Sequence, residues 1–238
     1  EVYASHFICN SHPNITWSEL FEEKEVPKKQ LKMLNARKVA CTLTTVYLGM
    51  NKTKEELGIK DYSIFIAPDS DSDKQYEAVQ DFFSGYCIIN CLNEIIPDCT
   101  PEGTCQLFLT TMTFGDVMKD IKPENYKKFK TKVAKDMIET CEKALNISIT
   151  PYIEEIEIAL PPTFARYLNT PQGTPYGYML EKWDSMIPRT VQYLQDQPFD
   201  NFLFCGASQE RGDGYGCAYY TGEKAGGIVV KAFKKEGK

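Results

Sequence analysis

Histidine is scarce in this chain of 238 residues, which contains only His6 and His12. A Ser-His-Asp or Cys-His hydrolase needs a histidine placed to take a proton from its nucleophile. Neither histidine stands beside a recognisable nucleophile motif. The sequence therefore argues against hydrolytic chemistry.

Positive charge is not in excess either, because 27 lysines and arginines stand against 33 acidic residues. Nucleic-acid binding usually needs a basic face, so a nucleic-acid partner is not expected. No apolar run reaches the ~18 residues of a membrane-spanning helix, and no signal-peptide pattern opens the chain. A reduced cytoplasmic compartment is expected from the cysteines, several of which lie in apolar runs. The basic tail leaves a peripheral membrane contact open; its lysines are Lys231, Lys234, Lys235 and Lys238.

Cysteine is abundant, but the spacing of a metal site is missing. The nine cysteines are odd in number and several lie in apolar runs, which favours a reducing compartment over a disulfide framework. Cys87, Cys91, Cys99 and Cys105 cluster along the chain without a C-x-x-C pair or a nearby histidine. No metal site is predicted.

The most distinctive segment of the chain runs from Asn201 to Gly226. Its apolar residues 202–205 predict a buried strand, Gly206 ends that strand, and a glycine-rich turn leads into a helix. Such a turn lets the backbone approach a ligand closely. It also directs the free amides of a helix N-terminus at an anion or an electron-rich edge.

These residues resemble the C-terminal, flavin-contacting segment of the phytoene desaturase, carotenoid isomerase and retinol saturase group of FAD-dependent oxidoreductases, which is related to the amine oxidases. Residues 162–177, PTFARYLNTPQGTPYG, resemble the family's P-T-x-x-R-Y-L-x-T-P-x-G-x-x-Y-G loop. Residues 4–17 resemble the strand that returns to the FAD domain, with its Asn-x-x-Pro ending. Residues 97–103 resemble a family turn. The resemblance touches both ends and the middle of the chain.

The G-x-G-x-x-G turn with which this family holds the FAD pyrophosphate has no counterpart in the sequence. Gly212, Gly214 and Gly216 alternate, but no third glycine stands at the spacing that the motif requires. The resemblance therefore implies the C-terminal half of a longer oxidoreductase, as a fragment or as a subunit. Its partner would be a Rossmann half, in cis or in trans.

Periodicity elsewhere predicts an α/β (α+β) fold. Strands are expected at 39–50, 62–67, 86–96 and 105–114, as an antiparallel sheet, and helices at 74–83 and 122–145. A further strand (153–160) and a helix near 178–186 are expected before the last strand and helix. The resemblance assigns 1–10 to a strand of the FAD-binding domain, 11–160 to a substrate-binding domain and 161–238 to the C-terminal, incomplete Rossmann-like part of the FAD-binding domain.

The resemblance also implies which residues contact FAD: Gly206, Ala207, Arg211, Gly212, Gly214, Tyr215 and Gly216. Arg211 departs from the small residue or proline of many relatives. An arginine there would either stabilise reduced flavin or pair on the surface with Glu210 or Asp213. The catalytic residues stay unknown, with Arg211, Glu210 and Tyr176 as weak candidates.

Substrate contacts are expected in the loop that holds Thr174, Tyr176 and Tyr178, because tyrosines offer aromatic surface with a polar tip. The alternative is that the tyrosines pack against the rest of the fold. No arginine cluster is visible near the loop in sequence; Arg166 and Arg189 are the nearest, and each has an ordinary structural explanation. An apolar substrate is therefore expected.

The resemblance implies desaturation, saturation or isomerisation of a C–C bond in a hydrophobic, polyene-like or isoprenoid-like substrate. FAD would supply the redox chemistry, and this chain alone would be inactive. A non-catalytic binding or assembly module that keeps the fold without holding FAD is the alternative.

Overall fold

The computed structural model describes residues 2–210, 214–235 and 237, without the side chains of 192 and 194–196. The chain forms two compact units. Unit 1 combines residues 1–41 with 165–238, and unit 2 comprises residues 42–164. Residues 11–41 cluster with unit 1. Their assignment to the substrate-binding domain stays a prediction from the resemblance.

Unit 2 is built on an antiparallel sheet of five strands in the order β3-β4-β5-β2-β6. The antiparallel sheet expected from the sequence is confirmed. The later strand joins it as well, because β6 pairs with β2. The strands are β2 (Thr42–Met50), β3 (Ser63–Ile66), β4 (Cys87–Cys91), β5 (Cys105–Thr113) and β6 (Ile153–Ala159).

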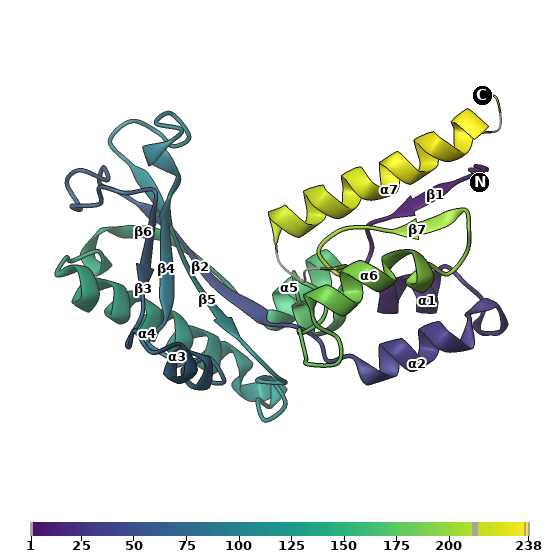
Figure 1. The fold of residues 1–238 in the computed structure, drawn as a ribbon. Coiled ribbons are helices and arrows are strands. Elements are labelled where there is room, and N and C mark those ends of the chain that lie inside the picture. Colours follow the sequence, from purple (N-terminus) through teal and green to yellow (C-terminus); the bar gives the residue numbers. More distant parts are fainter. Residues whose placement is uncertain (1, 211–213, 236, 238) are drawn as a thin grey trace. The chain divides into compact units, whose positions relative to one another are not determined.

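One face of this sheet carries the main hydrophobic core. Inward side chains such as Val46 and Leu109 are fully buried, and Val133 and Cys141 of α4 (Tyr126–Leu145) lie in the same cluster. Figure 1 shows α4 running along this face of the sheet. The helix ends at Asn146, whose φ of 54° is the left-handed geometry that asparagine tolerates. The short α3 (Ser72–Ala78) begins at Asp71, whose side chain caps its first amides.

The other face of the sheet carries apolar side chains that are partly exposed. Tyr47 and Phe108 are cross-strand partners in edge-to-face contact, with ring centroids 5.3 Å apart. Phe65 opposite Ile88 continues the face at its far side, and Phe65 is 66% exposed. Polar side chains share this face, because Glu157 lies opposite Tyr47 and Asn90 opposite Phe108, so its aromatic surface is bordered by polar groups.

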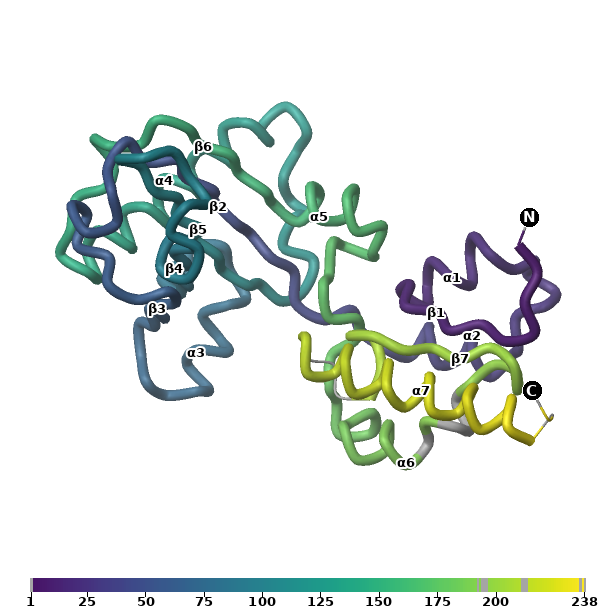
Figure 2. The backbone as a smooth tube through the Cα atoms, turned by 90° about the horizontal axis from the view of Figure 1, so that it is seen from above, coloured from purple at the N-terminus to yellow at the C-terminus, as the bar shows by residue number. Residues whose placement is uncertain are grey.

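Unit 1 contains two parallel strands, β1 (Phe7–Cys9) and β7 (Phe202–Phe204). Phe204 packs with Trp17 of α1 (Pro13–Glu19) on one face, while Leu203 and Ala225 of α7 (Tyr215–Lys235) share a cluster on the other. Figure 2, seen from above, shows α7 alongside β7, as Figure 1 also does. The remaining helices are α2 (Lys28–Ala36) and α6 (Met186–Asp196) in unit 1, and α5 (Pro161–Leu168), which crosses the boundary between the units.

Several predicted elements differ from the structure. The strand expected over 86–96 ends at Cys91, where a 3-10 helix (Leu92–Glu94) follows, and the helix expected over 74–83 spans Ser72–Ala78. The segment that follows β1 is not extended but forms α1, because His12 caps the helix and Pro13 takes its first position. The helix expected near residues 178–186 is absent from the described chain at that place; α6 begins only at Met186, after the cap residue Ser185. Among the described helices, none combines the length and the apolar character that a membrane span requires.

Candidate functional site

Both parallel strands of unit 1 end at the same edge, beside the glycine-rich segment. Ligands of open parallel sheets bind outside the carboxyl ends of the strands, which makes this edge the candidate site. Gly206 follows β7 with a φ of 95°, and its amide donates to Thr221 Oγ1 at 2.8 Å. A Cβ at Gly206 would overlap the side-chain amide of Asn10, so the ends of the two strands meet without room for any side chain.

The loop expected to contact substrate lies directly against this turn. Gly177 has a φ of 83°, and a Cβ there would come within 3.0 Å of Ser208. The Tyr176 ring stands 3.2 Å from the position that a Cβ on Gly214 would take, at the entry to α7. The structure thus brings the Tyr176 loop, the turn after β7 and the start of α7 together.

Two of the expected substrate contacts are buried. Thr174 is fully buried, and Tyr178 is 1% exposed, with its hydroxyl donating to Asn14 Oδ1. The Tyr178 ring contacts His12 edge to face at 4.9 Å, and burial raises the pKa of its phenol. These placements favour packing roles for Thr174 and Tyr178. Tyr176, which is half-buried, stays the candidate for a substrate contact.

An ion cluster joins α2 and α6 to this loop. Arg37 binds the Asp184 carboxylate with two hydrogen bonds, of 2.8 and 2.9 Å, and Arg189 Nη2 donates to the same carboxylate at 2.6 Å. Arg189 also donates to the backbone carbonyls of Tyr178, Met179 and Gln209. Burial alone would raise the pKa of Asp184, but the hydrogen bonds from Arg189 and Arg37 hold it below its usual value. The sequence showed no arginine cluster near the loop. The fold creates one by bringing Arg37 to Asp184, which is 147 positions away in the chain, beside Arg189.

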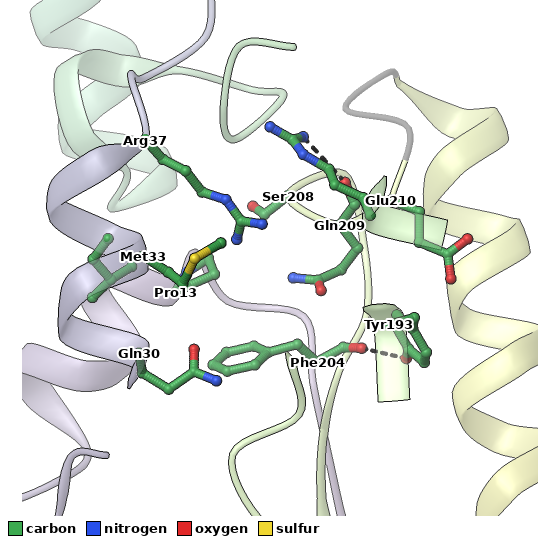
Figure 3. Close-up of a pocket in the computed structure, with 11 residues that line it drawn as sticks. Pro13, Gln30, Met33, Arg37, Tyr193, Phe204, Ser208, Gln209 and Glu210 are labelled. Carbon is green, nitrogen blue, oxygen red and sulfur yellow. Dashed lines mark hydrogen bonds between the residues drawn. The ribbon is translucent and has the colours of Figure 1, made fainter. Parts of the chain in front are cut away.

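A narrow pocket with a cavity volume of about 30 Å³ lies beside this cluster. In Figure 3 the guanidinium of Arg37 and the amide of Gln209 extend into the space between α2 and the turn, while the Glu210 carboxylate points away, toward α7. The lining residues come from α1, α2, α6, β7 and the turn: Pro13, Gln30, Met33, Leu34, Arg37, Arg189, Tyr193, Phe204, Ser208, Gln209 and Glu210.

The remaining expected residues divide into exposed and buried ones. Tyr215 is 83% exposed and stacks on Tyr219 of the same helix, and Gly216 is exposed beside it. Ala207 is half-buried in the turn. Glu210 is 1% exposed and pairs with Lys224, which favours a structural role over proton transfer to a substrate. Arg211, Gly212 and Asp213 lie outside the described residues.

These residues fit a flavin edge but not a whole dinucleotide. The turn after β7 and the first turn of α7 offer backbone amides at a helix N-terminus, which suits an electron-rich ring edge. The pocket volume of about 30 Å³ has room for about two waters, so an isoalloxazine would lie against the turn and not inside the pocket.

Burial of His12 makes the stability of unit 1 depend on pH. Burial lowers the pKa of His12 to about 4, outweighing a hydrogen bond to the Gly177 backbone that raises it. The unfolded chain therefore binds the proton more tightly, and folding free energy is lost as the pH falls from about 6.5 toward 4. We expect a loss of about 3 kcal/mol over this window in denaturant melts. His12→Gln should flatten the dependence and His6→Gln should retain it; an unchanged slope in His12→Gln would contradict the assignment.

The chain resembles known oxidoreductases in sequence and fold. It is 24% identical over 193 residues to the chloroplastic prolycopene isomerase of Daucus carota, a match that covers 75% of this chain and 29% of that protein. This similarity confirms the resemblance to the carotenoid isomerase group. The chain thus spans about three tenths of the length of this curated relative, and no family model matches it.

Among solved structures, a putrescine oxidase variant from a redesign of cofactor binding is 13% identical, with a TM-score of 0.52, covering 96% of this chain and 43% of that one. This likeness shows a shared fold. An oxidoreductase from Methanosarcina mazei is 11% identical with a TM-score of 0.44, over 93% of this chain and 43% of that one.

Proposed function

We propose that this chain is the substrate-binding and C-terminal flavin-contacting part of a flavin-dependent oxidoreductase. It would desaturate, saturate or isomerise a C–C bond of a hydrophobic polyene or isoprenoid. The observation that carries the proposal is the meeting of three segments at the carboxyl ends of β1 and β7: the Tyr176 loop, the Gly206 turn and the entry to α7. Their resemblance to carotenoid isomerases, which the carrot relative supports, gives this meeting point its chemistry.

Within this proposal, backbone amides at Ala207 and at the start of α7 would face the pyrimidine edge of FAD, together with Gly214 and Gly216. FAD would supply the hydride chemistry when bound. The chain's own residues would fix its orientation: Gly206 and Gly214 keep the backbone free of side chains, and the Tyr176 ring covers the entry to α7. The pyrophosphate would be held by a Rossmann half outside this sequence.

The substrate class is supported by unit 2 taken by itself. Its open sheet face carries Tyr47, Phe65 and Phe108 in partly exposed positions, suited to a long apolar molecule. We propose that this face contributes the substrate surface. We also propose a cytoplasmic location, with the basic C-terminal lysines available for a peripheral membrane contact.

A non-catalytic binding or assembly module is the second candidate. The small pocket and the lack of a G-x-G-x-x-G turn in this sequence favour it for the chain alone. Adding excess FAD to the purified chain and removing free ligand separates the roles. We expect little retained flavin; a stoichiometric flavin spectrum would contradict the proposal that the pyrophosphate cradle lies elsewhere.

The proposed reaction is tested in a protein extended by its own upstream coding region. Tyr176→Ala should lower turnover of a polyene at least tenfold while flavin content stays at the wild-type level, because the ring covers the cofactor edge without holding the cofactor. Tyr167→Ala, at a side chain 80% exposed, serves as the matched control and should change neither quantity. Faster flavin reduction by amines than by any isoprenoid would overturn the substrate class and leave the flavoprotein proposal standing.

A further inference from the structure

The pocket between α2 and the turn after β7 is surrounded by an unbalanced set of charges. Arg37 and Arg189 share the single carboxylate of Asp184. Glu210, the other charged residue of the lining, pairs through Oε1 with Lys224 on the side that faces α7, while its Oε2 is buried without a hydrogen-bond partner among the described residues. Among the described residues at the pocket, one positive charge is therefore left without a counter-charge.

This excess charge is buried rather than solvated. The side chains of Arg189 and Asp184 are each 4% exposed, and that of Arg37 is 15% exposed. Backbone carbonyls stabilise Arg189, but Nε of Arg189 is buried without a hydrogen-bond partner among the described residues. A buried donor of this kind costs free energy unless something accepts its proton.

Neutral hydrogen-bonding groups complete the pocket wall. Gln30 and Gln209 contribute amides and Ser208 a hydroxyl, and Figure 3 shows the Arg37 guanidinium extending toward Ser208 and Gln209. Met33 and Phe204 supply apolar contacts on the other sides. Nε and Nη2 of Arg37 already bind Asp184, so Nη1 of Arg37 and the neighbouring amide and hydroxyl groups are the donors that face a small anionic group here.

The volume limits the ligand. A water needs ~10–15 Å³ measured in this way, so a cavity of about 30 Å³ accepts a group of two or three heavy atoms. The geometry points to a binding site for a monocarboxylate in this pocket, with Arg37 and Gln209 as its recognising side chains. The site shares the turn after β7 with the surface proposed for the flavin edge. The inference itself does not depend on the proposed oxidoreductase activity, because its test measures carboxylate binding.

The purified chain tests this site directly. Sodium formate and sodium acetate are titrated by calorimetry and in thermal melts, with sodium chloride at matched ionic strength as the reference. We expect saturable 1:1 binding of formate, and a rise in Tm of about 3 °C at a tenfold excess over the Kd. An equal rise with chloride would overturn carboxylate recognition, as would the absence of saturable heat.

Variants separate recognition from general charge effects. Arg37→Gln should weaken formate binding at least tenfold, whereas Lys38→Gln, which removes the same charge from an exposed neighbouring side chain, should stay within twofold of wild type. Gln209→Leu leaves the ion cluster intact, because Arg189 binds only the Gln209 backbone carbonyl, and it should weaken binding about fivefold. If Arg37→Gln does not fold, the Gln209→Leu variant alone therefore decides whether the proposal holds. Unchanged formate affinity in Gln209→Leu would overturn the proposal.

Discussion

Asp184→Ala is expected to lower the free energy of unfolding by about 3–5 kcal/mol, because it leaves two buried guanidinium groups without their shared carboxylate. Arg37 loses two hydrogen bonds and Arg189 loses its shortest one. Arg189 also ties the backbone carbonyls of residues 178, 179 and 209, so the loss should loosen the Tyr176 loop together with the turn after β7.

Chemical denaturation measures this effect, and Glu181→Ala is its matched control. Glu181 pairs with Lys38, whose side chain is 70% exposed, so removing that ion pair should cost less than about 1 kcal/mol. Hydrogen exchange at residues 176–179 and 206–210 should increase in Asp184→Ala and not in the control. Equal destabilisation by the two variants would show that the buried cluster is no more important than a surface pair.

Gly206→Ala is expected to cost about 3–4 kcal/mol, through two separate effects. The φ of 95° is a conformation that residues with a side chain rarely adopt, which alone costs about 1–3 kcal/mol. The added Cβ would also overlap the side-chain amide of Asn10, where β1 ends. The strand ends would have to separate to admit it.

A double variant distinguishes the two effects. Asn10→Gly in the Gly206→Ala background should recover the steric part of the loss and leave the backbone part. Gly222→Ala, within α7 and with nothing inside 4 Å of its added Cβ, is the control and should raise stability by up to about 1 kcal/mol. Wild-type stability in Gly206→Ala would mean that the two strands do not meet at this point as described.

Local pattern in the sequence was enough to predict most of unit 2. Apolar and other residues alternate in β2 and β5, and apolar residues recur every three to four positions in α4. Each pattern arises because one face of the element is buried, so the pattern predicts the element. The short α1 was missed because Ile15 and Trp17 resemble a continuing strand. The helix α2 was missed because its inward side is only partly buried and includes the polar Gln30 beside Met33 and Leu34.

The candidate site was only partly visible in the sequence. The glycines of the turn and of the Tyr176 loop could be identified because a backbone with positive φ and no room for a Cβ requires glycine at that position of the sequence. The ion pair of Arg37 with Asp184 joins residues far apart in the chain, and the sequence around either residue does not predict it. The burial of Tyr178 likewise follows from its contacts with His12 and Asn14, which are tertiary.

The pairing of β1 with β7 also sets the order in which the chain can fold. Phe7 and Phe202 are partners although nearly the whole sequence lies between them, whereas the strands of unit 2 pair within residues 42–164. Contacts of small sequence separation form faster, and domains fold as units during synthesis. Unit 2 should therefore be folded before β7 and α7 have been synthesised. Until then, β1 has no strand to pair with and residues 1–41 cannot fold with the rest of unit 1. During that interval Trp17 and Phe21 would be exposed, which makes the N-terminal segment the part of the nascent chain most in need of a chaperone.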